Sequence, residues 1–344
     1  MTGYRLFLPL SCLIIVLLIN LITTPTFFKI TINNGVLYGY IIDVINRASE
    51  LVVLAVGMTL VVSASAGTDI SVGAVMAVSA AVCTRVLAGG EVSVNEYANP
   101  HIPAVLAALA VAVVCGGFNG FLVAKLKIQP MVATLILFTA GRGISQLVTN
   151  GQITYIRVDG YKLLGNNIPG IPIPTPIFVA VIVVALTYIL LNKTAMGMYI
   201  QSVGINERAS RLVGLKSVKI IWMAYAFCGL CAGIAGLVAS SRYLFRGCQQ
   251  HRPQHGAGRY RGSGFRRQLL GGGRFSLLGS VIGAYTIQAL TTTLYAMSVP
   301  ADQIPVYKAI VVILIVAVQS EELKKFRKRL ASRHASGNVE GGVA

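Results

Sequence analysis

The chain has 344 residues, of which 55% are hydrophobic and only 12% are charged, and its mean hydropathy is +0.73. Soluble domains carry about 25% charged residues, so this composition excludes an ordinary soluble protein. A formal net charge of +18 would suit a nucleic-acid-binding protein, but the basic residues fall into short loops and a tail, as in the cytoplasmic loops of membrane proteins. We therefore expect a chain that crosses a membrane many times.

Apolar stretches long enough to cross a bilayer recur along the chain. A spanning helix needs about 20 apolar residues, because its backbone groups must bond within the helix. Nine such spans are predicted, at 6–23, 50–65, 70–88, 103–124, 130–149, 174–191, 219–240, 277–296 and 304–320. The expected fold class is an all-α polytopic membrane protein of about nine or ten transmembrane helices, in one transmembrane domain over residues 1–344.

The distribution of Lys and Arg predicts the orientation of these spans. The loop between the sixth and seventh spans and the tail 321–344 are both rich in basic residues, so both are expected in the cytoplasm. Lys125 and Lys127 follow the fourth span, which places the N-terminus in the cytoplasm too. An even number of crossings must separate the central loop from the tail. Only three are visible there, so one crossing is missing.

The missing crossing coincides with an arginine-rich stretch, 248–270, that lies between two apolar spans. One interpretation is a loop that binds nucleic acid or phosphate. The other is that the gene sequence is out of frame here, because a shift of one nucleotide over Cys248 to Leu269 permits the peptide ANNIGLNMELDAIAAVVFGGNS. That peptide is apolar where a span is missing and restores ten crossings. We favour the frame error.

The second and third spans are separated by a polar break that contains Asp69. A carboxylate at membrane depth is costly unless it faces protein or water, so it is a functional candidate. It is also placed to cap the helix that follows by accepting N–H bonds, and this is the favoured interpretation. The break reads Ala66, Gly67, Thr68, Asp69, Ile70, Ser71, Val72 and Gly73.

This break resembles the glycine-glycine-isoleucine-aspartate-leucine-serine-valine-glycine pattern of permease subunits of bacterial ABC importers for ribose, xylose and related sugars, with differences at its first glycine, its isoleucine and its leucine. The resemblance continues through 119–143, 197–214 and beyond Gly271, and looks closest to the galactofuranose branch. It implies import of a monosaccharide across the bacterial inner membrane. The implied partners are an ATP-binding cassette subunit, a periplasmic sugar-binding protein and a second permease subunit, with membrane lipid around them.

A polar sugar needs a path lined by hydroxyl and amide groups, because an unpaired hydroxyl in an apolar site costs roughly 2–7 kcal/mol. Asn119, Thr134 and Gln146 offer such groups within spans, although they serve equally well to bond neighbouring helices. Arg142 is a second charge at membrane depth, with three open roles: pairing, snorkelling to the surface or sugar contact. With Asp69, these four residues form the predicted substrate pathway.

The central loop contains a predicted short helix from about Glu207 to Leu212, which Asn206 caps and Gly214 ends. Exposed Arg208 and Arg211 suit docking to a soluble partner, whereas composition alone also allows an ordinary solvated loop. In the family that the chain resembles, this is the coupling helix that docks on the ATP-binding subunit. The resemblance favours that role.

Two other functions would need different residues from those present. An ion-coupled secondary transporter of a small polar solute would rely on intramembrane carboxylates and internal repeats, but the sequence offers one such carboxylate, Asp69, and no clear repeat. An intramembrane enzyme would need a nucleophile with a base, or a metal cluster, and the four histidines are scattered. We expect no catalytic residues, no metal site and no cofactor in this chain.

Overall fold

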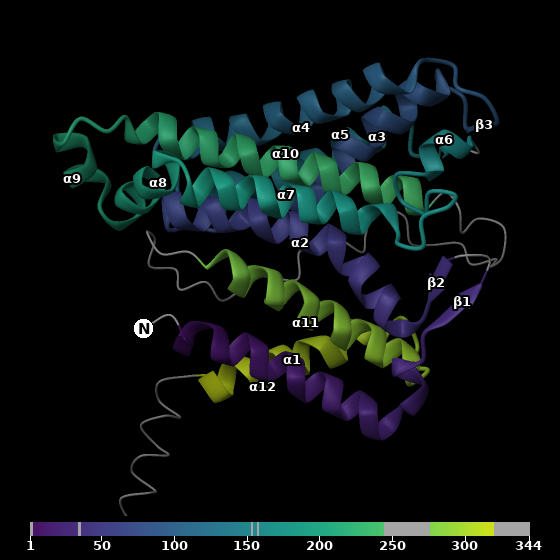
Figure 1. The fold of residues 1–344 in the computed structure, drawn as a ribbon. Coiled ribbons are helices and arrows are strands. Elements are labelled where there is room, and N and C mark those ends of the chain that lie inside the picture. Colours follow the sequence, from purple (N-terminus) through teal and green to yellow (C-terminus); the bar gives the residue numbers. More distant parts are fainter. Residues whose placement is uncertain (1–2, 34–35, 153, 157, 244–275, 320–344) are drawn as a thin grey trace, which may run out of the picture.

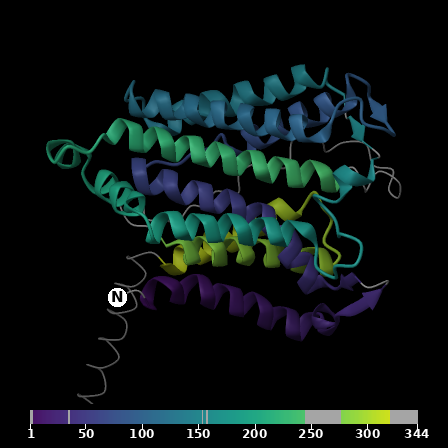
Figure 2. The ribbon, with the colours of Figure 1, turned by 45° about the horizontal axis from the view of Figure 1, so that its top comes forward.

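The computed structural model describes residues 3–33, 36–152, 154–156, 158–243 and 276–319. Long helices run side by side in three layers (Figures 1 and 2). The first layer holds α3 (Val72–Ala88), α4 (His101–Ala124) and α5 (Pro130–Val148). The second holds α2 (Tyr40–Ser65), α7 (Thr175–Asn192) and α10 (Ser217–Tyr243). The third holds α1 (Gly3–Thr23), α11 (Leu277–Ala296) and α12 (Ile304–Gln319).

Short elements mark the two ends of this bundle. At one end, called the α9 end, lie α8 (Ala195–Ile205) and α9 (Glu207–Leu212). The opposite end, called the hairpin end, carries the small elements of the structure. These are a 3-10 helix (Pro25–Phe28), the antiparallel hairpin β1 (Thr31–Asn33) with β2 (Val36–Tyr38), the parallel pair β3 (Ser93–Val94) with β4 (Tyr155–Ile156), and α6 (Asp159–Lys162).

Helix length and apolarity agree with membrane crossing. Among the described residues, α2, α4, α5, α7, α10 and α11 are long and apolar enough to cross a bilayer. Two shorter apolar helices, Leu10–Thr23 within α1 and Val72–Ala88, accompany them. The expected all-α polytopic fold is confirmed. Each of the nine predicted spans coincides with a helix.

α10 lies at the centre of the bundle and packs against α2, α3 and α4. It approaches α4 closely because glycines face each other where the two helices cross. A Cβ atom on Gly116 would lie 2.4 Å from the carbonyl oxygen of Tyr225, and one on Gly229 would lie 2.4 Å from that of Ala112. Small residues of this kind let membrane helices pack backbone to backbone.

The start of α2 is the clearest difference from the sequence-based expectation. The predicted span begins at residue 50, whereas the helix begins at Tyr40 and includes Asp43, Arg47 and Glu50. Those charges interrupt the apolar pattern but not the helix. The Glu50 carboxylate lies 2.8 Å from the Arg242 guanidinium on α10, so a buried ion pair accommodates the charge.

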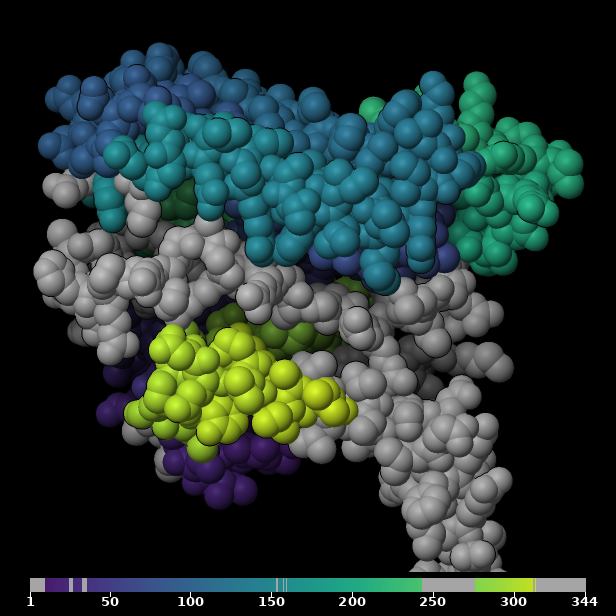
Figure 3. Space-filling view, turned by 180° about the vertical axis from the view of Figure 1, so that it is seen from behind, coloured from purple at the N-terminus to yellow at the C-terminus, as the bar shows by residue number. Residues whose placement is uncertain are grey.

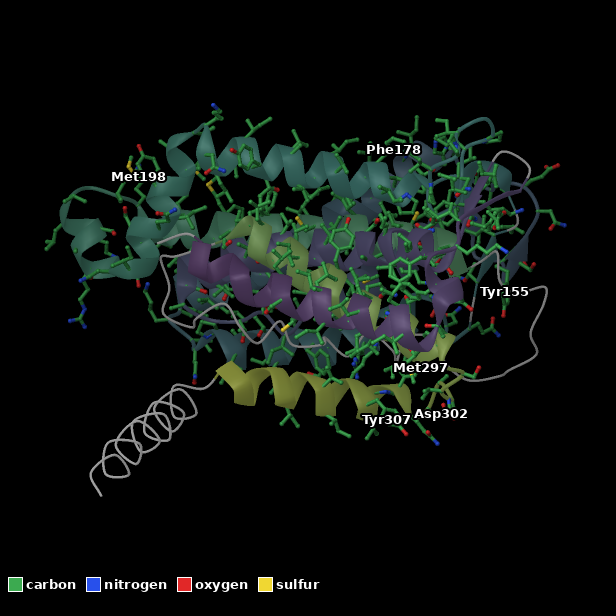
Figure 4. The ribbon with its side chains drawn as sticks, turned by 60° about the horizontal axis from the view of Figure 1, so that its bottom comes forward. Tyr155, Phe178, Met198, Met297, Asp302 and Tyr307 are labelled. Atoms are coloured by element: carbon green, nitrogen blue, oxygen red, sulfur yellow. The ribbon has the colours of Figure 1, made fainter. Side chains whose placement is uncertain are left out.

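The last described residues of α10 and the first described residues of α11 lie at opposite ends of the bundle. α10 ends at the hairpin end, where Arg242 contacts Glu50 and Asn46 near the start of α2. α11 begins toward the α9 end, where Thr59 donates to Ser280 over 2.8 Å. It ends at the hairpin end, where Figure 4 shows Met297 on the same side as Tyr155 and far from Met198. The proposed out-of-frame stretch, 248–270, lies outside the described residues.

Candidate functional site

A cluster of polar side chains surrounds the break between α2 and α3. α2 ends at Ser65, and the next residue, Ala66, has a left-handed φ of 53° that turns the chain out of the helix. The carboxylate of Asp69 then accepts the backbone N–H of Ser71 over 2.8 Å and the Ser71 hydroxyl over 2.6 Å. Asp69 is only 4% exposed, so its charge is held by protein groups.

The break is tied to α4 and α5 by two of the residues that the sequence singled out. Asn119 on α4 donates from Nδ2 to the Ser71 hydroxyl over 2.8 Å. The hydroxyl of Thr134 on α5 accepts the backbone N–H of Ile70 over 3.2 Å. Both side chains are fully buried. The structure therefore brings Asp69, Asn119 and Thr134 into one cluster, the break cluster, with Ser71 as its centre.

One acceptor of the break cluster has no hydrogen-bond partner among the described residues. It is the side-chain oxygen Oδ1 of Asn119, a buried group. Leaving a buried acceptor unpaired costs about 1–3 kcal/mol, so such a group favours any ligand hydroxyl that reaches it. A polyhydroxylated solute has the matching donors.

The structure corrects the capping role in detail. Asp69 accepts a backbone N–H at the start of α3, as predicted, but the residue in the N-cap position is Ser71. Asp69 therefore stabilises the turn that leads into the helix and fixes the Ser71 hydroxyl toward Asn119.

Arg142 and Gln146 do not join the break cluster. They lie on the hairpin-end half of α5, whereas Thr134 lies near its other end. The guanidinium of Arg142 stacks over the Phe138 ring, 4.1 Å from its centroid, and Gln146 is exposed. Within the described part of the chain, Arg142 contacts the Phe138 ring and forms no ion pair.

The break is also in close contact with the start of α5. A Cβ atom on Gly67 would lie 2.4 Å from the Cβ atom of Pro130, the first residue of α5. This position therefore needs glycine for steric reasons. Pro130 therefore lies directly against the backbone two residues before Asp69.

The predicted short helix of the central loop is present as α9, with the predicted ends. The Asn206 side chain accepts the N–H of Ala209 over 3.0 Å, which caps the first turn. Gly214 follows the last turn with a left-handed φ of 86°. Arg208 and Arg211 are exposed, and so are Leu212 and Val213, which are 90% and 76% exposed. α9 thus presents a basic and apolar tip away from the bundle.

Glu207, at the start of α9, gathers several donors that the sequence did not reveal. Lys127, in the loop between α4 and α5, places its Nζ atom 2.5 Å from the Glu207 carboxylate. Arg211 pairs with the same carboxylate, and the Ser217 hydroxyl donates to it over 3.2 Å. Partial burial acts to raise the pKa of Glu207, but the hydrogen bonds and charges of Lys127 and Arg211 outweigh it and hold that pKa below its usual value.

The sequence missed three residues that matter here. Lys127 looked like a topology marker, and Glu50 and Arg242 lay outside or at the edge of the predicted spans. Their charges inside or beside apolar helices were the available signal. The described residues contain no group of three or more His, Cys, Asp or Glu side chains that could hold a metal ion.

Comparison with known proteins gives consistent matches over nearly the whole chain. A family model described as the permease component of branched-chain amino acid transport systems matches residues 40–319. The chain is 38% identical to a galactofuranose transporter permease of Escherichia coli, over 94% of this chain and 92% of that protein. It is 34% identical to a fructose import permease of Bifidobacterium longum, over 88% and 83%. It is 31% identical to a ribose import permease of Escherichia coli, over 91% and 93%. No solved structure matches the chain.

Proposed function

The chain belongs to this family of transport permeases and is the membrane-spanning permease subunit of an ABC-type monosaccharide importer in the inner membrane; we propose that its sugar is galactofuranose. The protein is a transport subunit and not an enzyme. Its family implies an ATP-binding partner and a sugar-binding protein. The specific sugar rests on the relative that is 38% identical over 94% of this chain. We further propose that it pairs with a second permease subunit, identical or related, surrounded by membrane lipid.

The break cluster carries the proposal for the substrate pathway. Asp69, Asn119 and Thr134 supply carboxylate, amide and hydroxyl groups between α2, α3, α4 and α5, toward the α9 end of an otherwise apolar bundle. These groups are buried and bonded to one another, as a closed pathway requires. In the sugar-accepting state they exchange those bonds for sugar hydroxyls, with the Asn119 side-chain oxygen as the acceptor left for the first of them. Arg142 and Gln146 lie nearer the pathway mouth at the hairpin end.

The coupling step runs through α9. ATP binding and hydrolysis on the partner pull on this helix, whose tip carries Arg208, Leu212 and Val213. Glu207 passes the movement to Lys127, and the loop after Lys127 leads within three residues to Pro130, which touches Gly67. The contacts from Glu207 to Gly67 thus form one continuous path from the docking helix to the break cluster. Alternating access follows when α9 shifts.

The α9 end is the cytoplasmic end in this proposal. Its basic residues include Lys125, Lys127, Lys193, Arg208 and Lys216, as expected for cytoplasmic loops. α1 begins at this end, and α12 runs toward it from Ile304 (Figure 1). Both chain termini, including the basic tail 321–344, are therefore assigned to the cytoplasm, and the hairpin end faces the sugar-binding protein.

The stretch 248–270 is proposed to be out of frame. The described flanks support a crossing there, because α10 ends at the hairpin end and α11 begins toward the α9 end. Restoring a crossing gives an even number between α9 and the tail. Resequencing the gene tests this: two compensating shifts, near codons 248 and 270, are expected. An uninterrupted codon series for the printed residues would refute it.

Sugar uptake by cells tests the function. Cells without their own importer would express this permease, with 248–269 replaced by ANNIGLNMELDAIAAVVFGGNS, together with its ATP-binding and sugar-binding partners. Uptake of labelled galactofuranose, ribose and fructose would then be compared. We expect uptake of galactofuranose in preference to the other two, and loss of all uptake when the ATP-binding subunit is inactivated. Uptake that survives that inactivation would instead support an ion-coupled transporter.

A further inference from the structure

A hollow of about 370 Å³ lies between the end of α4 and the start of α10, at the α9 end, and its lining residues are not those of the break cluster. Its apolar wall includes Phe121, Val218 and Trp222. Lys125, Lys216 and Lys219 complete its lining. The hollow thus combines an aromatic wall with three lysines: Lys125 directly follows α4, Lys216 directly precedes α10, and Lys219 lies in the first turn of α10.

The indole of Trp222 packs against α4 at Gly117, a residue without a side chain. A Cβ atom on Gly117 would lie 3.3 Å from the indole Cζ2 atom, tighter than ordinary van der Waals contact. Trp222 remains 42% exposed and Phe121 40% exposed, so both rings form part of the outer surface. Exposed Trp near the end of a membrane helix is typical of the headgroup region, where its apolar body and polar N–H are both accommodated.

The three lysines are available for a ligand of opposite charge. All three are exposed, and within the described residues none of them forms an ion pair. The Nζ atom of Lys125 lies above the Phe121 ring, 5.4 Å from its centroid, so its charge is beside the aromatic wall. Nearby Lys127 differs, because Glu207 already neutralises it. Among the described residues, no carboxylate lines the hollow.

We propose that this hollow binds the phosphate headgroup of an anionic phospholipid. The three ammonium groups bind the phosphate, and the wall of Phe121, Val218 and Trp222 packs against the glycerol and the first acyl carbons. Basic pockets between helices on the cytoplasmic side are suited to anionic headgroups, because nearby Lys side chains are attracted to an anionic surface. The assignment rests on the proposed function for the cytoplasmic placement of the α9 end. The source is lipid, because an aromatic wall at the bilayer edge gives a free phosphate ion nothing to pack against.

Trp222 is the one tryptophan in the sequence, so its fluorescence reports on this hollow alone. The full chain in detergent would be titrated with phosphatidylglycerol brominated on its acyl chains, which quenches indole emission, and with equally brominated phosphatidylcholine. We expect the anionic lipid to quench at about tenfold lower concentration. The triple variant K125Q/K216Q/K219Q should lose this preference. The matched control, K193Q/K324Q/K325Q, removes three charges elsewhere in the sequence and should retain it.

Three results would overturn the proposal. Equal quenching by the two lipids would exclude recognition of charge, and an unchanged preference in the K125Q/K216Q/K219Q variant would exclude these lysines. Relief of the quenching by inorganic phosphate at the same phosphate concentration would mean that the site recognises the free ion. The readout requires neither ATP nor sugar, so failure here leaves the transport function untouched, and failure of transport leaves this result standing.

Discussion

The Nζ atom of Lys127 lies 2.5 Å from the carboxylate of Glu207, which joins the loop between α4 and α5 to the first residue of α9. The two side chains are 47% and 32% exposed, and exposed ion pairs contribute only about 0–1 kcal/mol to stability. The pair therefore matters for position more than for folding. Figure 3 shows the same region from behind, where the segment around α8 and α9 projects beyond the face formed by α4 and α5.

Replacing Lys127 by Gln should weaken coupling and leave folding intact. The substitution removes the charge that holds α9 to the loop before Pro130, so ATP hydrolysis no longer moves the break cluster efficiently. We expect sugar-stimulated ATPase activity to fall severalfold at an unchanged level of protein in the membrane. K193Q is the control, since Lys193 is also exposed at the α9 end but forms no ion pair within the described residues. Equal activity of K127Q and K193Q would disprove the coupling role.

The contribution of the Glu207 carboxylate to the stability of the fold should depend on pH only in acid solution. Its folded-state pKa lies below the ordinary value of 4.5, so its ion pairs stabilise the fold above that ordinary value and are lost as the pH falls through the folded-state pKa. The melting midpoint of the purified permease, relative to that of E207Q, should be constant from about pH 6 to 8. The difference should vanish only below the ordinary Glu pKa. A difference that disappears near neutral pH would contradict the ion-pair geometry.

Gly67 should not tolerate even one methyl group. In G67A the new Cβ atom would lie 2.4 Å from Pro130, and neither the proline ring nor the backbone of the break is a flexible chain end. We expect a loss of about 1–3 kcal/mol in the free energy of unfolding, measured in mixed micelles. G143A is the matched control, because a Cβ atom on Gly143 meets no described atom within 4 Å. Equal stability of the two variants would show that the break and α5 are not in rigid contact.

Asp69 variants separate its structural role from a role in transport. If Asp69 acts by accepting the bonds from Ser71, then D69N keeps an acceptor oxygen and should retain uptake, since Asn and Asp serve about equally at helix starts. D69A removes the acceptor and should lose both stability and uptake. A D69N protein that inserts normally but does not transport would show that the charge itself acts on the sugar or its path.

The local features that the sequence predicted well depend on neighbours in the chain. The ends of α9 follow from Asn206 and Gly214, and the helix spans follow from apolar length. The start of α2 was predicted ten residues late, because Glu50 is paired by Arg242, almost two hundred residues away. A partner that distant leaves no local pattern.

The candidate pathway shows the same limit. The sequence predicts Asn119 and Thr134 as pathway residues only because they are polar groups in apolar spans, and the structure brings them to the break beside Asp69. It predicts Arg142 and Gln146 on the same grounds, and these lie elsewhere on α5. Which polar groups meet depends on the rotation and depth of each packed helix. The amino-acid composition of one span carries no information about the rotation or the depth of its helix.

The most direct test of the importer assignment is sugar-stimulated ATPase activity of the permease reconstituted with its ATP-binding and sugar-binding partners. It would be measured for the chain as printed and for a version in which 248–269 is replaced by ANNIGLNMELDAIAAVVFGGNS. We predict that galactofuranose stimulates ATP hydrolysis with the replaced version and not with the printed one. Absence of stimulation by any of galactofuranose, ribose and fructose, with both versions fully inserted, would contradict the assignment.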